Sequence, residues 1–163
     1  MVEATGRERA STVVIGRTGK NIINYLQGYN TYPNKKFDQV KPANKCDNDG
    51  IAVNSKFNAV IWEGKGKVAV FGHNDWKRFS PGHPTINCHK GDVTDIAWNP
   101  HSESLLATAC EDGKLRFFEI QDEKGVNEIV SSADAEFDAH DRKILGFQWH
   151  KQTESLLASY GLE

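Results

Sequence analysis

The chain has 163 residues, of which 38% are hydrophobic and 26% are charged, and its net charge is −2. This composition is typical of one soluble globular domain, and no stretch approaches the roughly 18 consecutive apolar residues that a membrane span needs. The first ten residues lack the apolar core of a secretory signal, and the three cysteines are too widely spaced for a disulfide framework or a C-x-x-C site. We therefore expect a cytoplasmic protein with reduced thiols, without a membrane span, and without a metal or cofactor.

Charge is unevenly distributed along the chain. Residues 1–90 contain 14 Lys or Arg against 7 Asp or Glu, whereas residues 91–163 contain 6 against 15. This asymmetry favours an acidic partner for the first half, although two solvated faces without a target would give the same counts.

The N-terminal segment, residues 1–34, is expected to form a divergent and partly irregular leader. Within it, Gly16 to Asn21 is similar to a phosphate-binding loop. The full pattern needs a glycine at the position of Val14 and a Ser or Thr at Asn21, so we do not expect nucleotide binding.

The first predicted unit spans about residues 50–80. Its strands are Ala59 to Trp62 and Lys67 to Phe71, separated by a Gly-Lys-Gly turn at 64–66. Short apolar runs bounded by glycines are typical of strands rather than helices.

The second unit spans about residues 89–120 and contains three predicted strands. Val93 to Trp98 is followed by an Asn-Pro-His-Ser turn, and Leu105 to Cys110 is an almost continuous apolar run, as expected for a strand buried on both faces. The Asp112-Gly113 turn then leads to Leu115 to Ile120, because Asp-Gly strongly favours a hairpin.

The third unit spans about residues 125–163. Its acidic link, 121–139, is expected to hold an insertion and the outer strand of the next blade. Beyond the link, His140 to Glu163 repeats His89 to Asp112 at a shift of 51, and a weaker copy upstream matches at a shift of 45. These periods fit four-stranded blades of roughly 40–45 residues with insertions. We therefore predict an all-β fold for residues 35–163: an incomplete WD40-type β-propeller of antiparallel sheets, with about two blades and the start of a further one.

Leu106 to Ile120 resembles the WD-repeat ending usually written LASGSEDGTVRVWDL. Phe118 stands where the tryptophan normally sits, so the side-chain network of His, Ser or Thr, Asp and Trp can be only partial. Seven residues are expected to have structural roles in the repeats: His89, Trp98, Thr108, Asp112, Phe118, His140 and Trp149.

A more specific resemblance concerns the units around residues 50–101. Gly50 to Val70 resembles the first blade of coronins, in which an AVN-x-KF-x-A strand leads to a Gly-rich turn. Pro81 to His101 resembles the coronin approach to the second blade, GH-x-G-x-V-x-D-x-x-W-x-P-H. The resemblance implies binding to F-actin, a place in the cytoplasm at the cytoskeleton, and action with the branched-actin nucleating complex.

The same resemblance suggests where filaments bind. An arginine near the first strand contributes to binding in coronins, and its position here is Val40, beside Lys41. The remaining cations near the first unit are the candidate actin-binding residues: Lys35, Lys36, Lys41, Lys45, Lys77 and Arg78. A merely solvated basic face is the alternative.

Other functions are less consistent with the sequence. Neighbouring Cys88 and His89 on a strand point to opposite faces, so they do not form a nucleophile–base pair, and the histidine spacing fits no usual zinc motif. The aromatic and basic residues 76–79 lack a nucleic-acid-binding motif around them. We expect no enzyme activity and no nucleic-acid binding; the alternative function is a general WD-repeat adaptor for protein complexes.

The end of the last unit suggests a property of the isolated chain. Its second strand is followed by a turn that would lead to a third, so we expect the chain to stop before the propeller closes. An open strand edge invites pairing with another chain, so self-association and marginal stability are predicted.

Overall fold

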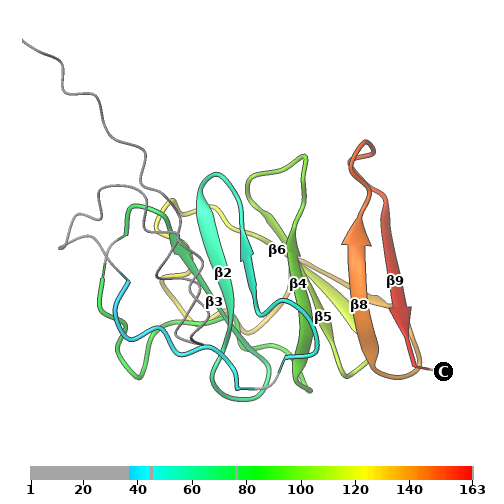
Figure 1. Cartoon of the computed structure of the whole chain (residues 1–163), viewed down its shortest axis with the longest axis horizontal. Helices are drawn as coiled ribbons and strands as arrows, with labels where there is room; N and C mark the ends of the chain where they lie inside the picture. Colours follow the sequence, from blue (N-terminus) through cyan, green and yellow to red (C-terminus); the bar gives the residue numbers. More distant parts are fainter. Residues whose placement is uncertain (1–36, 45, 76, 163) are drawn as a thin grey trace, which may run out of the picture. The chain divides into compact units, whose positions relative to one another are not determined.

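The computed structural model describes residues 37–44, 46–75 and 77–162, which fold into nine strands in three antiparallel sheets (Figure 1). Sheet 1 contains β1 (Ile51–Val53), β2 (Phe57–Trp62) and β3 (Lys67–Gly72). Sheet 2 contains β4 (Val93–Trp98), β5 (Leu105–Cys110), β6 (Lys114–Glu119) and β7 (Ala135–Asp138). Sheet 3 contains β8 (Ile144–Trp149) and β9 (Leu157–Gly161). Within this part of the chain, no helix is long and apolar enough to cross a membrane.

The all-β fold with antiparallel sheets is confirmed. β4 and β5 have the predicted bounds, and β2, β3 and β6 differ from prediction by only one or two residues at their ends. β5 is buried over its last five residues, because it lies between β4 and β6 in its sheet and between neighbouring sheets on its two faces.

The sequence repeat is also a structural repeat. β8 has the same length as β4 and begins 51 residues later. Both strands carry a register irregularity at the same place, between Val93 and Asp95 in β4 and between Ile144 and Gly146 in β8. Because β4 and β8 have the same length and the same register irregularity, residues 51 positions apart point in equivalent directions in sheets 2 and 3.

Apolar layers between the sheets form most of the core. One layer, which includes Phe57, Trp98 and Phe118, lies between sheets 1 and 2. A second layer, which includes Leu115 and Trp149, lies between sheets 2 and 3. Burying apolar area at about 25 cal/mol per Å² makes these layers the main stabilising contribution of the fold.

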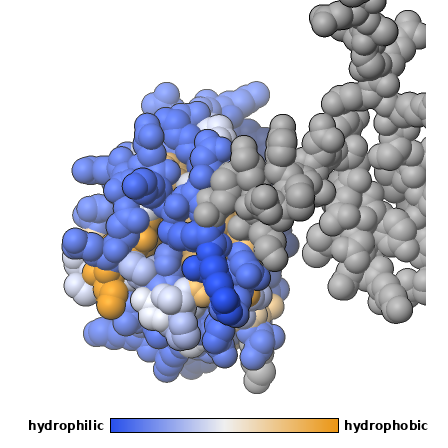
Figure 2. All heavy atoms as spheres, turned by 90° about the vertical axis from the view of Figure 1, so that its left-hand side faces the viewer, coloured by the Kyte–Doolittle hydropathy of each residue, from blue (hydrophilic) through white to orange (hydrophobic). Residues whose placement is uncertain are grey.

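Sheet 1 also buries its second face. Alternate residues of β2 and β3, among them Trp62 and Phe71, pack there against Phe37 and Phe79. The Phe37 and Phe71 ring centroids are 4.7 Å apart, and those of Phe71 and Phe79 are 4.9 Å apart. Seen from this end of the molecule, hydrophilic side chains cover most of the described surface (Figure 2). The chain's own segments therefore cover sheet 1 on the side away from sheet 2.

The link between sheets 2 and 3 differs from our expectation. We placed the outer strand of the next blade in residues 121–139, but β7 pairs with β6 and completes sheet 2. The preceding residues, 121–130, which we call the strap, run back along the outer edge of sheet 1. Val126 N–H donates to the Val70 carbonyl at 3.0 Å, and Gly72 N–H donates to the Lys124 carbonyl at 3.1 Å.

Two glycines allow the strap to approach β3 this closely. Gly125 has a φ of 92°, and a Cβ added there would lie 2.3 Å from the Val70 carbonyl oxygen. A Cβ added to Gly72 would lie 2.2 Å from the Glu123 carbonyl oxygen. Only glycine is compatible with this approach, and the edge of β3 is covered as a result.

Candidate interaction surface

His89 connects the first two sheets. Its Nε2 lies 2.8 Å from the Thr108 hydroxyl on β5, and its Nδ1 lies 3.0 Å from the Gly66 carbonyl oxygen in the β2–β3 turn. Burial lowers the pKa of His89 to about 4, so the ring is neutral near pH 7. Sheet 3 repeats part of this arrangement, with His140 Nε2 3.0 Å from the Ser159 hydroxyl. The structure therefore places both histidines where they hold loops onto the sheets.

Asp112 has a different partner from the one expected. Its carboxylate accepts hydrogen bonds from Arg116 Nη1 at 3.1 Å and Nη2 at 2.7 Å rather than joining His89. Burial alone would raise the pKa of Asp112, but the Arg116 hydrogen bonds outweigh burial and hold this pKa at about 2. Arg116 Nε also donates to Glu136 on β7 at 2.7 Å. Phe118, in the usual tryptophan position, contributes a ring contact to His89 with centroids 6.0 Å apart.

Trp98 and Trp149 attach each sheet to the one before it. The Trp98 indole N–H donates to the Ala52 carbonyl on β1 at 3.2 Å. The Trp149 indole N–H donates to the Ala97 carbonyl on β4 at 3.5 Å. Both tryptophans are buried, at 8% and 9% exposure, and combine apolar packing with a satisfied polar group.

Only part of the candidate actin-binding set lies in the described residues. Those outside it are Lys35, Lys36 and Lys45. Lys41 is exposed, with its Nζ 3.5 Å from the Glu63 carboxylate. Lys77 forms an ion pair with Asp75, and Arg78 is exposed.

Backbone pairing brings the two basic segments together. Asp38 N–H donates to the Lys77 carbonyl at 3.0 Å, and Phe79 N–H donates to the Asp38 carbonyl at 2.9 Å. The segment that carries Lys41 therefore lies beside the segment that carries Lys77 and Arg78, although about 36 residues separate them in the sequence.

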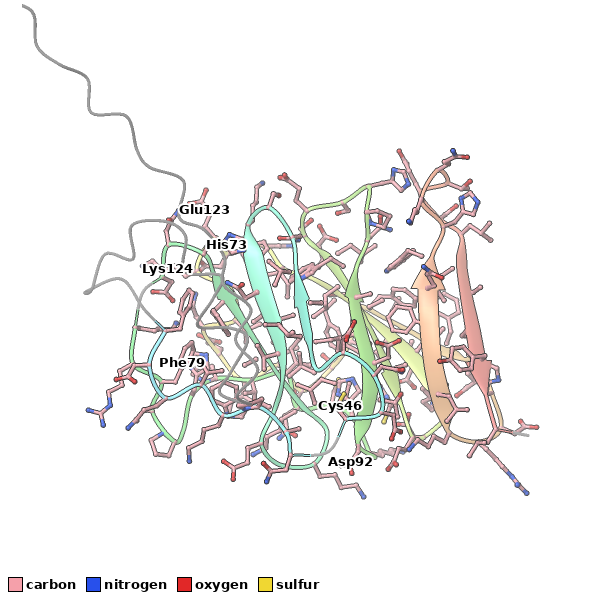
Figure 3. All side chains as sticks on the ribbon, in the orientation of Figure 1. Cys46, His73, Phe79, Asp92, Glu123 and Lys124 are labelled. Carbon is pink, nitrogen blue, oxygen red and sulfur yellow. The ribbon has the colours of Figure 1, made fainter. Side chains whose placement is uncertain are left out.

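Strand ends divide the molecule into two faces. The lower face, as drawn in Figures 1 and 3, is formed by the turns 63–66 and 111–113 and the loops 89–92 and 140–143. The upper face is formed by the β1–β2, β4–β5 and β8–β9 turns. Asp92 lies at the lower face, and His73, Glu123 and Lys124 lie at the upper face (Figure 3).

Two lysines on the lower face were not among the predicted residues. Lys65, in the β2–β3 turn, and Lys90, in the loop before β4, are both exposed. A Cβ added to Gly66 would lie 2.6 Å from the His89 carbonyl oxygen, so the turn and the loop are in contact. In the sequence, the glycines at 64 and 66 indicate a turn that exposes Lys65. The contact between this turn and residue 89 is visible only in the folded structure.

Several other sequence candidates have no assembled site. In the described part of the chain, no group of three His, Cys, Asp or Glu side chains could hold a metal ion. Gly16 to Asn21 and Trp76 lie outside the described residues.

Comparison with known proteins supports the family suggested by the sequence. Residues 25–78 match a domain of unknown function, DUF1899, and residues 81–119 match the WD domain, G-beta repeat. Coronin-2B of Xenopus laevis is 40% identical over 81 residues, or 48% of this chain, and Coronin-2A of Bos taurus is 29% identical over 149 residues, or 81% of it. These matches make the chain similar to coronins. Its coronin resemblance lies in the N-terminal part of the propeller, where both family models match.

A solved coronin structure has the same fold. The WD40 domain of Toxoplasma gondii coronin matches with a TM-score of 0.69 and 23% identity, over 78% of this chain and 33% of that one. The aligned parts cover 17% of the Xenopus coronin and 28% of the bovine coronin. The chain thus spans less than a third of the length of the curated relatives named here.

The coronin arginine position has a specific environment in this chain. Val40 is partly buried and packs against the cluster that contains Trp62 and Phe79. A side chain packed in this way contributes no charge to the surface. Exposed Lys41 follows this position in sequence, and exposed Arg78 lies on the segment that pairs with residue 38.

Proposed function

We propose that this chain binds actin filaments through exposed cations around sheet 1. The proposal is supported by the similarity to coronins, because the coronin resemblance implies filament binding. The observation that carries it further is the assembly of exposed cations from separate segments at one end of the molecule: Lys41, Lys65, Arg78 and Lys90.

These cations suit a long-range electrostatic encounter with an acidic filament. Exposed lysines and arginines add steering and modest affinity, and both are screened as salt rises, since the Debye length is about 8 Å at 0.15 M ionic strength. Glu63 neutralises Lys41 only in part. The Lys41 Nζ is 3.5 Å from the Glu63 carboxylate, and the two side chains are 50% and 56% solvent-exposed, respectively, so water screens the pair. The proposed binding surface therefore includes Lys41 in spite of this ion pair.

Co-sedimentation with actin filaments across a salt series tests the proposal. Pelleting of the soluble chain should require filaments and should decline as salt increases. A control spin without filaments measures self-association separately. A folded chain that fails to pellet with filaments at low salt would contradict the proposal and favour the general adaptor function.

Charge-reversal variants locate the surface. Lys41→Glu with Lys45→Glu, and separately Lys65→Glu with Lys90→Glu, should each weaken filament binding about tenfold, the change expected when two steering charges are reversed. Lys124→Glu with Lys151→Glu on the upper face is the matched control, because it reverses the same number of charges, and it should bind like the unmodified chain. Equal weakening in all three variants would indicate an effect of net charge rather than a surface around sheet 1.

The wider role follows from the same proposal. We propose a binding scaffold without catalysis, acting in the cytoplasm at the actin cytoskeleton and in contact with the branched-actin nucleating complex. We also propose self-association through the edge of β9, which pairs only with β8 among the described strands. Sedimentation velocity over a concentration range tests the self-association, and pull-down with the purified nucleating complex tests that contact.

A further inference from the structure

One serine–proline pair occurs in the chain, and it lies beside the cations proposed to bind filaments. Of the 5 prolines, only Pro81 follows a serine or threonine. Proline lacks a backbone N–H and restricts the residue before it, here Ser80, to an extended conformation. A serine followed directly by proline is the substrate pattern of proline-directed protein kinases. Ser80 therefore has the local sequence of a phosphate acceptor.

The fold presents Ser80 to solvent. Phe79, which precedes it, is 2% exposed and packs against the second face of sheet 1 (Figure 3). Successive side chains of an extended segment point in opposite directions, so the buried ring directs its two neighbours, Arg78 and Ser80, outward. Both neighbours are exposed, and within the described residues the Ser80 hydroxyl has no hydrogen-bond partner.

A turn keeps the segment open beyond Ser80. The Ser80 carbonyl accepts a hydrogen bond from His83 N–H at 3.1 Å, so residues 80–83 form a β-turn. Pro81 occupies the second position of this turn, where its fixed φ is favoured. Pro81 and Gly82 are exposed, and no atom lies within 4 Å of a Cβ added to Gly82. The residues that follow the acceptor are therefore free of packing, which gives a kinase access to it.

Arg78 is the cation placed to meet a phosphate on Ser80. Its segment is held by backbone pairing, because Phe79 N–H donates to the Asp38 carbonyl at 2.9 Å. Among the described residues Arg78 forms no ion pair, even with Asp38 across the bridge that joins their segments. Residues two apart in an extended segment point the same way, so the guanidinium offers its parallel N–H donors on the side where the phosphate would lie.

We propose that Ser80 is a phosphorylation site of a proline-directed kinase, and that its phosphate pairs with Arg78 and removes this cation from the surface around sheet 1. In the reaction, the Ser80 Oγ bonds to the γ-phosphorus of ATP and the bond from that phosphorus to the β–γ bridging oxygen breaks. ADP leaves with the electron pair, and the hydroxyl proton passes to a base of the kinase. The phosphate carries a charge of about −1.5 to −2 at pH 7. Its effect on filament binding rests on the proposed function, whereas the phosphorylation and the pairing with Arg78 are independent of it.

Phosphorylation of the folded chain tests the site. The full chain is incubated with ATP and a purified mitogen-activated protein kinase, and mass spectrometry of its peptides locates the phosphate. We expect phosphate on Ser80 and none at this position in Ser80→Ala or Pro81→Ala. Both variants should keep the urea midpoint of the unmodified chain, because both side chains are exposed. A synthetic peptide of residues 74–86 is the control for access: a kinase that modifies the peptide but not the folded chain, or modifies neither, would overturn the proposal.

Titration of the phosphate by phosphorus NMR tests its pairing. The second pKa of a phosphoserine is about 6, and a guanidinium beside the phosphate should lower this pKa. Arg78→Gln should raise it again, whereas Lys151→Gln, on sheet 3, should leave it lowered. A phosphate pKa that Arg78→Gln does not change would overturn the pairing.

Co-sedimentation of the phosphorylated chain measures the effect on the surface. One phosphate changes the local charge about as much as one Lys→Glu reversal does, so filament binding should weaken about threefold. Ser80→Ala, treated with the same kinase, should bind like the untreated chain. Equal binding of the phosphorylated and unmodified chains would overturn the effect on the surface. An unmodified chain that fails to bind would contradict the proposed function alone, because phosphorylation and pairing are measured without filaments.

Discussion

Lowering the pH from 7 to 4.5 should destabilise the fold through His89. Its pKa is about 4 in the folded chain, whereas an unfolded histidine has a pKa of about 6.5. Between these values the unfolded chain binds a proton that the folded chain does not bind. The stability contributed by the neutral ring is therefore complete above pH of about 6.5 and is lost as the pH falls toward 4.

The magnitude follows from the two pKa values and from the contacts of the ring. Linkage gives a loss of about 2–3 kcal/mol at pH 4.5, a large fraction of the 5–15 kcal/mol or so that stabilises a typical domain. In the neutral ring, Nδ1–H donates to the Gly66 carbonyl and Nε2 accepts from the Thr108 hydroxyl. Protonation introduces a second N–H and a charge into a site that is only 8% exposed at His89.

Urea unfolding followed by tryptophan fluorescence at both pH values measures this loss, and an NMR titration gives the pKa of His89 itself. The variant His89→Gln should be less stable at pH 7, but on acidification it should lose about 2–3 kcal/mol less of its stability than the unmodified chain loses. His83 is the comparison, because it is less buried than His89 and its pKa is also lowered, first by burial and then by the charge of Lys77. His83→Gln should remove a smaller part of the pH dependence. Full pH dependence in His89→Gln, or an NMR pKa for His89 near that of a free histidine, would refute the reasoning.

Three further substitutions test the contacts that join the sheets. Gly125→Ala should lower the free energy of unfolding by about 2 kcal/mol or more, because φ is 92° and the new Cβ meets the Val70 carbonyl. Amide exchange at Val126, which donates to that carbonyl, should accelerate. Gly82→Ala is the control and should be neutral, because no atom lies within 4 Å of its added Cβ. Trp98→Phe should lower the free energy of unfolding by about 1 kcal/mol for the lost indole hydrogen bond, in addition to any packing loss, and an unchanged urea midpoint would rule out that bond as a contributor. Arg116→Met should lower the free energy of unfolding in urea by about 3 kcal/mol, because Asp112 loses its buried partner. Adding Asp112→Leu should restore much of this loss. A double variant no more stable than the single one would contradict this account.

The strands and their repetition could be predicted from the sequence because they depend on local patterns. Leu105–Cys110 is apolar throughout and is bounded by turn residues, and the 51-residue shift places Trp149 where Trp98 stands in the previous unit. Turn chemistry at Asp112-Gly113 gave the hairpin, and Gly113 has the positive φ of 79° that such a turn requires.

The strap, the Asp112 partner and the cationic surface required the tertiary structure. The strap has no alternation of apolar and polar residues and no apolar run. Backbone hydrogen bonds hold it to β3, which lies about 55 residues earlier in the sequence, and such bonds leave no side-chain pattern. Asp112 could equally face His89 or Arg116 by sequence spacing, and the placement of Arg116 beside both Asp112 and Glu136 decides between them.

Lys65 and Lys90 illustrate the same limit for the candidate site. Each lies in a turn or loop whose local sequence predicts an exposed side chain, and both side chains are exposed in the structure. Their proximity depends on the docking of sheet 2 against sheet 1, where Gly66 reaches the His89 carbonyl. The sequence by itself determined the strand pattern, the repeat and the resemblance to coronins, because these arise from short-range periodicity and residue identity. Only the tertiary structure decided which charges meet and which edges are covered, because those contacts depend on how distant segments pack.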